Sequence, residues 1–132
     1  MFKHFFLSAA LIMATPIAAM ADPVTDVIEN QLDAFLQRDM ERAWSHASPM
    51  IKDIFITPDN FAQMVEQGYP IIFSSNRYTF SERVEKGPHV FQIVVVQGEN
   101  GGRAAFEYDM VQLNGAWKIN GVRPVPLNEL AV

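Results

Sequence analysis

The spacing of the apolar residues changes once along the chain, near residue 70, and this change limits the possible folds more than any other feature. Before that point, apolar residues recur every three or four positions, which is typical of helices packed on one side. From Ile71 onward they alternate with polar residues, and Gly, Pro and Asn separate the runs, as in antiparallel strands. The pattern predicts an α+β fold in which helices precede the sheet.

Three helices are expected before the change, over residues 24–36, 40–47 and 58–68. Asp39 can cap the second helix, and Ser48-Pro49 between the second and third is expected to form a short capped turn. Gly68 is expected to end the third helix in a left-handed conformation, which costs glycine little.

Three two-residue turns are expected to set the register of a curved sheet of four to five strands: Gly87-Pro88, Asn100-Gly101 and Asn114-Gly115. With these turns, one face becomes apolar and should pack on the helices. That inner face would carry Phe80, Val84, Phe91, Ile93, Val95, Phe106, Tyr108, Met110, Trp117 and Ile119. The outer face would carry Glu107, Asp109, Lys118 and Asn120, with an ion pair between the acidic side chains and Lys118.

Residues 1–21 have the pattern of a cleaved export signal. Lys3 and His4 precede an apolar run over residues 5–14, and Ala19-Met20-Ala21 matches the small-x-small cleavage site. The apolar run is about half of the roughly 20 residues that a membrane span needs. The protein is therefore expected to be periplasmic or secreted, with one domain over residues 22–123 and a tail over 124–132.

Composition excludes several classes of function. The absence of cysteine excludes disulfides and thiolate chemistry, and an excess of acidic over basic side chains, 15 to 10, disfavours nucleic-acid binding. His46 and His89 belong to no metal-binding spacing, so neither a metal nor another cofactor is indicated. Ser48 lies outside any nucleophile motif and is explained as a helix cap.

Several motifs resemble a bacterial family known only as a domain of unknown function. They are Ala47-Ser48-Pro49-x-Ile51, Phe61-x-x-Met64-Val65-x-x-Gly68-Tyr69-Pro70, Tyr108-x-Met110 and Gly115-x-Trp117-x-Ile119-x-Gly121. The order of elements is similar to the cone-shaped nuclear transport factor 2-like superfamily. That resemblance implies a cone that houses isomerases, dehydratases and epoxide hydrolases in some members, and non-catalytic ligand binders or partner modules in others.

The candidate pocket residues are Tyr78, Glu82, Tyr108, Arg123 and His46. The tyrosines can donate hydrogen bonds to a ligand carbonyl, and Arg123 can pair with Glu82 or bind an anion. Glu82 would interrupt the apolar face, where burial raises a carboxyl pKa and suits a general base. A β-bulge between Phe80 and Val84 would instead turn Glu82 to solvent and Arg83 inward, and this is the favoured alternative.

Two functions remain open at this point. The favoured one is a non-catalytic exported module that binds a small, partly apolar ligand or a protein partner. The alternative is a small-molecule isomerase, dehydratase or hydrolase that uses an inward Glu82 with Tyr108. A homodimer through the outer sheet face is a further possibility, because Val94, Val96, Val111 and Val122 would form an apolar stripe there.

Overall fold

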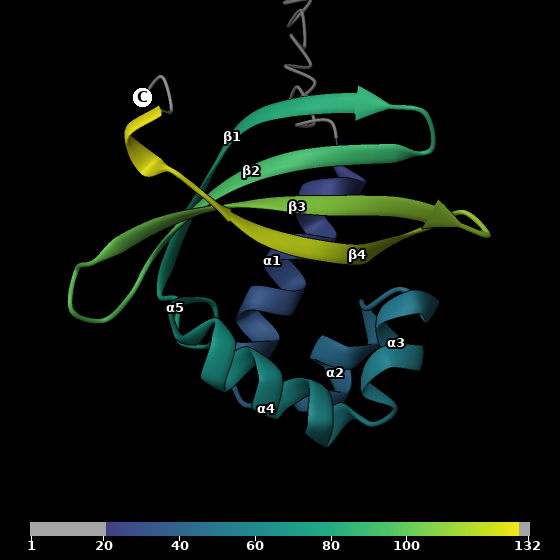
Figure 1. Cartoon of the computed structure of the whole chain (residues 1–132), viewed down its shortest axis with the longest axis horizontal. Coiled ribbons are helices and arrows are strands. Elements are labelled where there is room, and N and C mark those ends of the chain that lie inside the picture. Colours follow the sequence, from purple (N-terminus) through teal and green to yellow (C-terminus); the bar gives the residue numbers. More distant parts are fainter. Residues whose placement is uncertain (1–20, 130–132) are drawn as a thin grey trace, which may run out of the picture.

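The computed structural model describes residues 21–129, in which five helices precede four strands (Figure 1). The helices are α1 (Pro23–Leu36), α2 (Met40–Ser45), α3 (Pro49–Phe55), α4 (Pro58–Gly68) and α5 (Pro70–Phe73). The strands are β1 (Arg77–Lys86), β2 (His89–Gln97), β3 (Arg103–Leu113) and β4 (Ala116–Val125), followed by a short 3-10 turn, Leu127–Glu129. The predicted export signal, residues 1–21, lies outside the described residues except for Ala21. No helix within residues 21–129 is both long and apolar enough to span a membrane.

Capping side chains define the starts of the helices. Asp22 accepts hydrogen bonds from the backbone N–H groups of Val24 and Thr25, at 3.1 and 3.3 Å, and so begins α1. Ser48 and Thr57 cap α3 and α4 in the same way, each with proline at the following position.

Two helical segments differ from the expectation. The Ser48-Pro49 segment is a helix of seven residues rather than a turn. A short helix over Pro70–Phe73 also replaces the expected start of the sheet at Ile71, so β1 begins at Arg77. Gly68 is the last residue of α4 and has no left-handed conformation, because the following residue, Tyr69, provides the C-cap.

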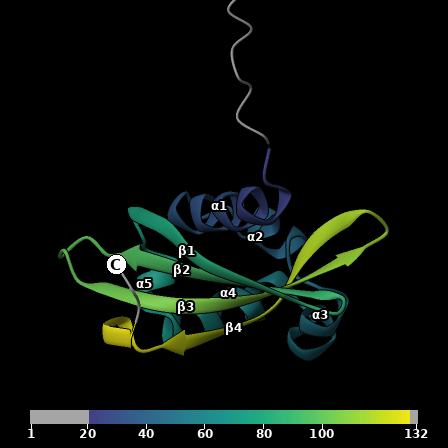
Figure 2. The same ribbon diagram turned by 90° about the horizontal axis from the view of Figure 1, so that it is seen from above.

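The sheet is antiparallel in the order β1-β2-β3-β4, and all the helices lie on its concave side (Figure 1). Figure 2 shows the strong twist that curves the strands around the helical layer. Ile28, Leu32 and Phe35 of α1 are almost fully buried and belong to one core with Val94 and Met110 of the sheet.

The register between β3 and β4 is as predicted at their turn. Asn114 and Gly115 both have positive φ, 51° and 80°, as a type I′ turn requires. Met110 consequently lies opposite Ile119, and both side chains are buried.

The predicted register between β2 and β3 is wrong by one residue. The loop is Glu99-Asn100-Gly101 rather than Asn100-Gly101, with Gly101 at φ 82° and the Gly98 N–H bonded to the Gly102 carbonyl at 2.9 Å. Three-residue hairpin loops of this kind place a left-handed glycine at their last position. The extra residue puts Tyr108 opposite Gln92 and reverses the faces of β2.

This reversal changes which side chains of β2 are inside. Val90, Gln92, Val94 and Val96 face the helices. The predicted inner residues Phe91, Ile93 and Val95 lie on the opposite face of the strand, although Val95 is only 8% exposed there. The predicted outer stripe for a homodimer is therefore wrong in its residues, because Val94 and Val96 are buried in the core and Val122 packs against it.

A β-bulge in β1 lies between Phe80 and Arg83, so Phe80 pairs with Val94 and Arg83 with Gln92. The bulge keeps Phe80 packed on the core and leaves Glu82 exposed. Arg83 Nε donates to Gln92 Oε1 at 2.7 Å. The favoured prediction, a β-bulge that turns Glu82 to solvent, is therefore confirmed and the inward alternative is wrong. Val84, predicted to lie inside, is exposed.

A second register shift, in β4, has Asn120 as its extra residue. Beyond it, Val122 lies opposite Tyr108, and Arg123 lies opposite Glu107 on the outer face, where Arg123 Nε donates to Glu107 Oε1 at 2.8 Å. The predicted inner position of Arg123 is therefore wrong, and so is the predicted pairing of Lys118, whose ammonium donates to the carbonyl of Ser45 at 2.8 Å.

The last strand of the sheet extends two residues past position 123. β4 continues to Val125, with Pro124 paired to Phe106 on the edge of the sheet, where proline is tolerated.

The faces of β2 predict a sharp difference between two neighbouring substitutions. Val94→Lys should lower the free energy of unfolding by about 3–5 kcal/mol, because it buries an unpaired charge. Ile93→Lys should lower it by only about 1 kcal/mol, because Ile93 is partly exposed on the outer face and the new ammonium lies opposite Glu107. Urea denaturation of both variants measures the difference, and the opposite order would restore the faces predicted from the sequence.

Candidate functional site

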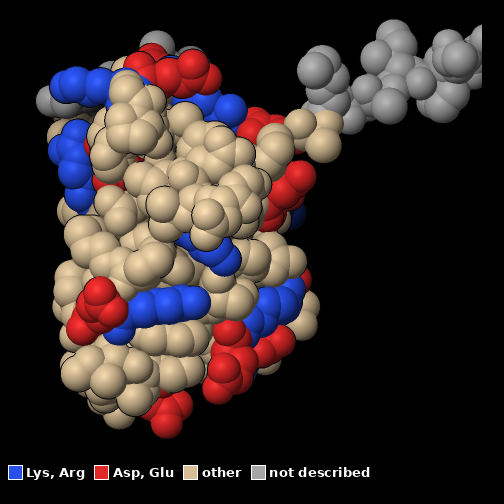
Figure 3. All heavy atoms as spheres, turned by 90° about the vertical axis from the view of Figure 1, so that its right-hand side faces the viewer, with Lys and Arg blue, Asp and Glu red and all other residues tan. Residues whose placement is uncertain are grey.

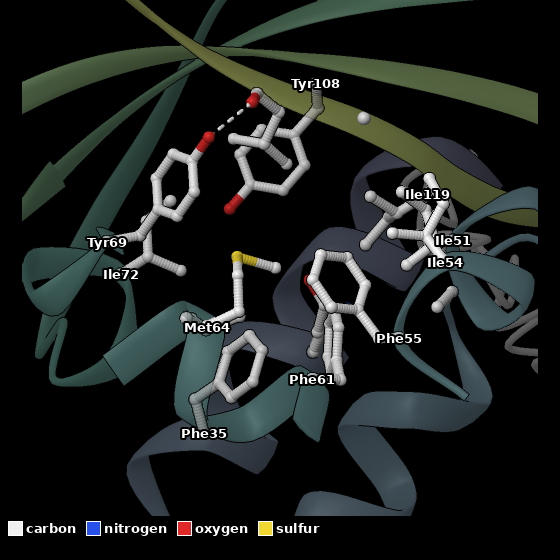
Figure 4. Close-up of a pocket in the computed structure, with 15 residues that line it drawn as sticks. Phe35, Ile51, Ile54, Phe55, Phe61, Met64, Tyr69, Ile72, Tyr108 and Ile119 are labelled. Carbon is white, nitrogen blue, oxygen red and sulfur yellow. Dashed lines mark hydrogen bonds between the residues drawn. The ribbon is translucent and has the colours of Figure 1, made fainter. Parts of the chain in front are cut away.

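A cavity of about 240 Å³ lies between the concave face of the sheet and helices α1, α3 and α4. Figure 4 shows it from the side, with the sheet above and the helices below. Its wall is formed by Gln31, Phe35, Ala47, Ile51, Ile54, Phe55, Phe61, Met64, Val65, Tyr69, Ile72, Tyr108, Ile119, Gly121 and Val122.

The segment between α2 and α3 is bonded to β4 and so holds this wall in position. Ile119 N–H donates to the His46 carbonyl and Ser48 N–H donates to the Ile119 carbonyl, both at 2.8 Å. The Ser48 hydroxyl also donates to Asn120 Oδ1 at 2.9 Å. These three bonds place α3 against the end of the sheet, and Ile51, Ile54 and Phe55 of that helix close one side of the cavity.

The wall is almost entirely apolar. No Asp, Glu, Lys, Arg or His is among the described residues that line it. Near its α3 side, Met50, Ile54 and Ile56 are exposed by 49%, 60% and 75%. Figure 3 shows the side of the molecule on which α3 lies, where uncharged side chains fill most of the middle. An apolar molecule would thus meet apolar surface both outside and inside the cavity.

The turn from α3 to α4 is strained. Ile56 has φ 72° and ψ −44°, and the Thr57 N–H donates to the Phe55 carbonyl two residues earlier, at 2.8 Å. A β-branched residue rarely adopts positive φ, so this turn stores conformational energy beside the cavity.

Two tyrosines stand side by side in the wall, and their hydroxyl groups differ. Tyr69 Oη donates to the Val122 carbonyl at 3.1 Å. Tyr108 is fully buried, and its Oη has no hydrogen-bond partner among the described residues. In Figure 4 the Tyr108 hydroxyl points down into the cavity, toward Met64.

The Tyr108 phenol is neutral in this setting. Burial raises its pKa far above the ordinary value, and the neighbouring Tyr69 adds to that effect. Tyr108 therefore offers the cavity one O–H donor and oxygen lone pairs, but no charge.

Gln31 is the other polar side chain in the wall, and it is 3% exposed. Its Nε2 donates to the Ala43 carbonyl at 3.1 Å, which ties α1 to α2. One of its two amide donors is thus already used by the fold.

Of the five candidate residues predicted from the sequence, only Tyr108 lines the cavity. Glu82 and Arg123 are exposed, at the β1 bulge and on the outer face. Tyr78 packs on Phe80 beside a shallow acidic hollow along α1, where burial and then Glu29 and Asp33 raise its pKa.

His46, the fifth candidate, caps the C-terminus of α2 and lies outside the cavity wall. Its Nε2 is 2.7 Å from Asn30 Oδ1. Burial, and then Lys118, Arg42 and Lys52, lower its pKa. The histidine therefore links α2 to α1.

A chain of hydrogen-bonded polar side chains lies on the outer side of the sheet. Asp109 Oδ1 is 2.6 Å from His89 Nδ1, and Asp109 Oδ2 accepts from Asn120 Nδ2 at 3.2 Å. Asn120 in turn accepts from Ser48, whose side chain is buried. This chain of hydrogen bonds joins β2, β3 and β4 to the start of α3. Within residues 21–129, no group of three acidic or histidine side chains is arranged to hold a metal ion.

Sequence reasoning missed most of the cavity wall. In the sequence, Phe61, Met64, Val65 and Tyr69 stand out only as parts of a family motif. The segment after Ser48-Pro49 contains more apolar residues than a short surface turn requires. This excess was the sequence signal that could have indicated a binding surface there.

The chain belongs to the family described as Domain of unknown function (DUF4864), whose profile matches residues 18–132. The comparison with curated proteins found no match.

Two solved structures share the fold at 14% sequence identity and a TM-score of 0.55. One is the solution structure of a SEC-C motif containing protein from Rhodopseudomonas palustris, matched over 76% of this chain and 77% of that chain. The other is the crystal structure of an NTF2-like transpeptidase candidate from Campylobacter jejuni, matched over 76% and 99%. At this level of identity the likeness concerns the fold alone, and it confirms the predicted α+β, nuclear transport factor 2-like class.

Replacing each of the two tyrosines with phenylalanine should affect the stability of the fold differently. Tyr69→Phe should lower the free energy of unfolding by about 1 kcal/mol, because it removes a hydrogen bond to the Val122 carbonyl. Tyr108→Phe should not lower it, because the hydroxyl has no protein partner to lose. Urea denaturation of the ligand-free variants provides the measurement. A larger loss at Tyr108 than at Tyr69 would contradict the geometry described here.

Proposed function

We propose that the protein is a non-catalytic module that binds a small, largely apolar ligand in the cavity beneath its sheet. The observation that carries this proposal is a space of about 240 Å³ where, among residues 21–129, Tyr69 and Tyr108 are the only ionisable side chains in the wall. Apolar pockets with a few placed polar groups are the usual form of small-molecule sites.

The volume limits the size of the ligand. An engineered apolar cavity of about 150 Å³ accepts benzene. A space of about 240 Å³ accommodates a molecule somewhat larger than a benzene ring. Fatty acids and sterols would extend out of it past the exposed side chain of Ile54.

The enzymatic alternative lacks its main component in this geometry. It required a carboxylate beside Tyr108, and Glu82 is exposed at the β1 bulge instead of lining the cavity. Enzymes of the superfamily generally place a carboxylate or histidine inside the cone, so a wall without either favours binding over catalysis.

Filling the cavity should abolish binding. Val122→Phe places a phenyl group beside Tyr108, its cross-strand neighbour, and should eliminate the thermal shift caused by compact neutral compounds slightly larger than benzene. In the unmodified protein, a ligand at about 100 times its Kd adds about 2.7 kcal/mol, which raises the melting temperature by several degrees.

The matched control is Val84→Phe, which adds the same ring to an exposed position on β1. This variant should keep the full thermal shift. A shift that survives Val122→Phe would mean that the compounds bind elsewhere on the protein.

We also propose that the protein acts outside the cytoplasm after removal of residues 1–21. Asp22, the expected first residue of the exported form, is also the N-cap of α1. Its other carboxylate oxygen forms an ion pair with Arg83 of β1. Cleavage after Ala21 would thus retain both contacts of Asp22, the N-cap of α1 and the ion pair with Arg83.

The exported protein should have an intact mass that corresponds to a chain starting at Asp22. Mass spectrometry of the periplasmic and culture-medium fractions measures this directly. A membrane-retained species that still contains residues 1–21 would contradict the proposal.

A further inference from the structure

We infer that the ligand is an uncharged molecule with a hydrogen-bonding oxygen, of the carbonyl type, that meets the hydroxyl of Tyr108. This inference rests on the proposed function, since it names the chemical class that the same cavity selects. It comes from the Tyr108 hydroxyl, a buried polar group of the wall that has no hydrogen-bond partner among residues 21–129.

The ring of Tyr108 belongs to the core, but its hydroxyl group is suited to contact a ligand. The side chain is 0% exposed, yet its oxygen has no hydrogen-bond partner among the described residues. Figure 4 shows this oxygen directed into the cavity, while the adjacent Tyr69 is bonded to the backbone of β4. Buried polar groups without partners are costly and rare, so an isolated one facing a cavity indicates a group that a ligand satisfies.

The same wall disfavours charged ligands. A carboxylate in the cavity would lose its water and find no Lys, Arg or His among the described lining residues to compensate it. An ammonium group would equally find no Asp or Glu there. The phenol of Tyr108 is neutral, so it supplies a hydrogen bond but no counter-charge.

The orientation of the ligand follows from where Tyr108 lies. Its hydroxyl is at the sheet side of the cavity, and Met64, Phe55 and Phe61 line the helical side (Figure 4). The oxygen of the ligand should therefore face β3, and its hydrocarbon part should lie against α3 and α4.

Three probes of the same shape but different polarity test this class: acetophenone, cumene and benzoate. Acetophenone carries a neutral carbonyl, cumene replaces it with hydrocarbon, and benzoate replaces it with a charged carboxylate. Isothermal titration of the full domain with each probe should show binding of acetophenone and cumene, and no binding of benzoate.

The decisive comparison is between two tyrosine variants. Tyr108→Phe should weaken acetophenone roughly 3- to 10-fold, the size of one neutral hydrogen bond, while cumene binds as well as before or more tightly. Tyr69→Phe, the matched control, should leave the ratio of the two affinities unchanged, because its hydroxyl is already bonded to Val122.

A spectroscopic measurement on the unmodified protein gives an independent readout. The carbonyl carbon of ¹³C-labelled acetophenone should move downfield on binding, relative to its position in an apolar solvent, because a hydrogen bond polarises the carbonyl. This measurement does not depend on whether the Tyr108→Phe variant folds.

The outcomes separate the two proposals. Equal effects of Tyr108→Phe on acetophenone and cumene, no downfield shift, or tight binding of benzoate would each overturn the inference and leave the cavity as a general apolar site. Failure of both acetophenone and cumene to bind the unmodified protein would instead overturn the proposed function.

Discussion

The pairing of the segment between α2 and α3 with β4 is the interaction on which the cavity depends. Two backbone hydrogen bonds connect Ile119 to His46 and Ser48, and the Ser48 side chain reaches Asn120. This contact covers part of β4, which is an edge strand, and it fixes the position of the start of α3 relative to the sheet. The position of α3 depends on this contact because none of its own residues is buried, although Ile51 and Phe55 pack partly against the core.

The fold class and most helix starts were predictable because they rest on local chemistry. Asp39 and Ser48, both predicted as caps, bond to the backbone N–H three positions ahead. Asn114-Gly115 fixes its hairpin for the same reason, since positive φ at two successive positions is a property of those residues alone. Interactions within a few residues of each other can be inferred from sequence without knowledge of the tertiary structure.

The inner and outer faces of the sheet were less predictable because a single extra residue reverses them. Gly101 serves as the last residue of a three-residue loop, although Asn100-Gly101 has the same composition as a two-residue turn. The bulges before Arg83 and at Asn120 each add a further reversal. The shifts in β1 and β4 explain why Glu82 and Arg123 do not line the cavity. Tyr108 does line it, because β3 itself contains no extra residue and keeps its predicted faces.

The state of Tyr108 links the stability of the fold to its proposed role. A phenylalanine at this position would fill nearly the same space and avoid the cost of a desolvated hydroxyl, which is on the order of 1–3 kcal/mol. That cost is a substantial fraction of the stability of a small domain. A ligand oxygen would remove the cost upon binding, so the same hydroxyl that weakens the empty protein would strengthen the complex. Under the proposed function, the cost of the unpaired hydroxyl lowers the stability of the empty protein, and a neutral ligand with a hydrogen-bonding oxygen would recover it.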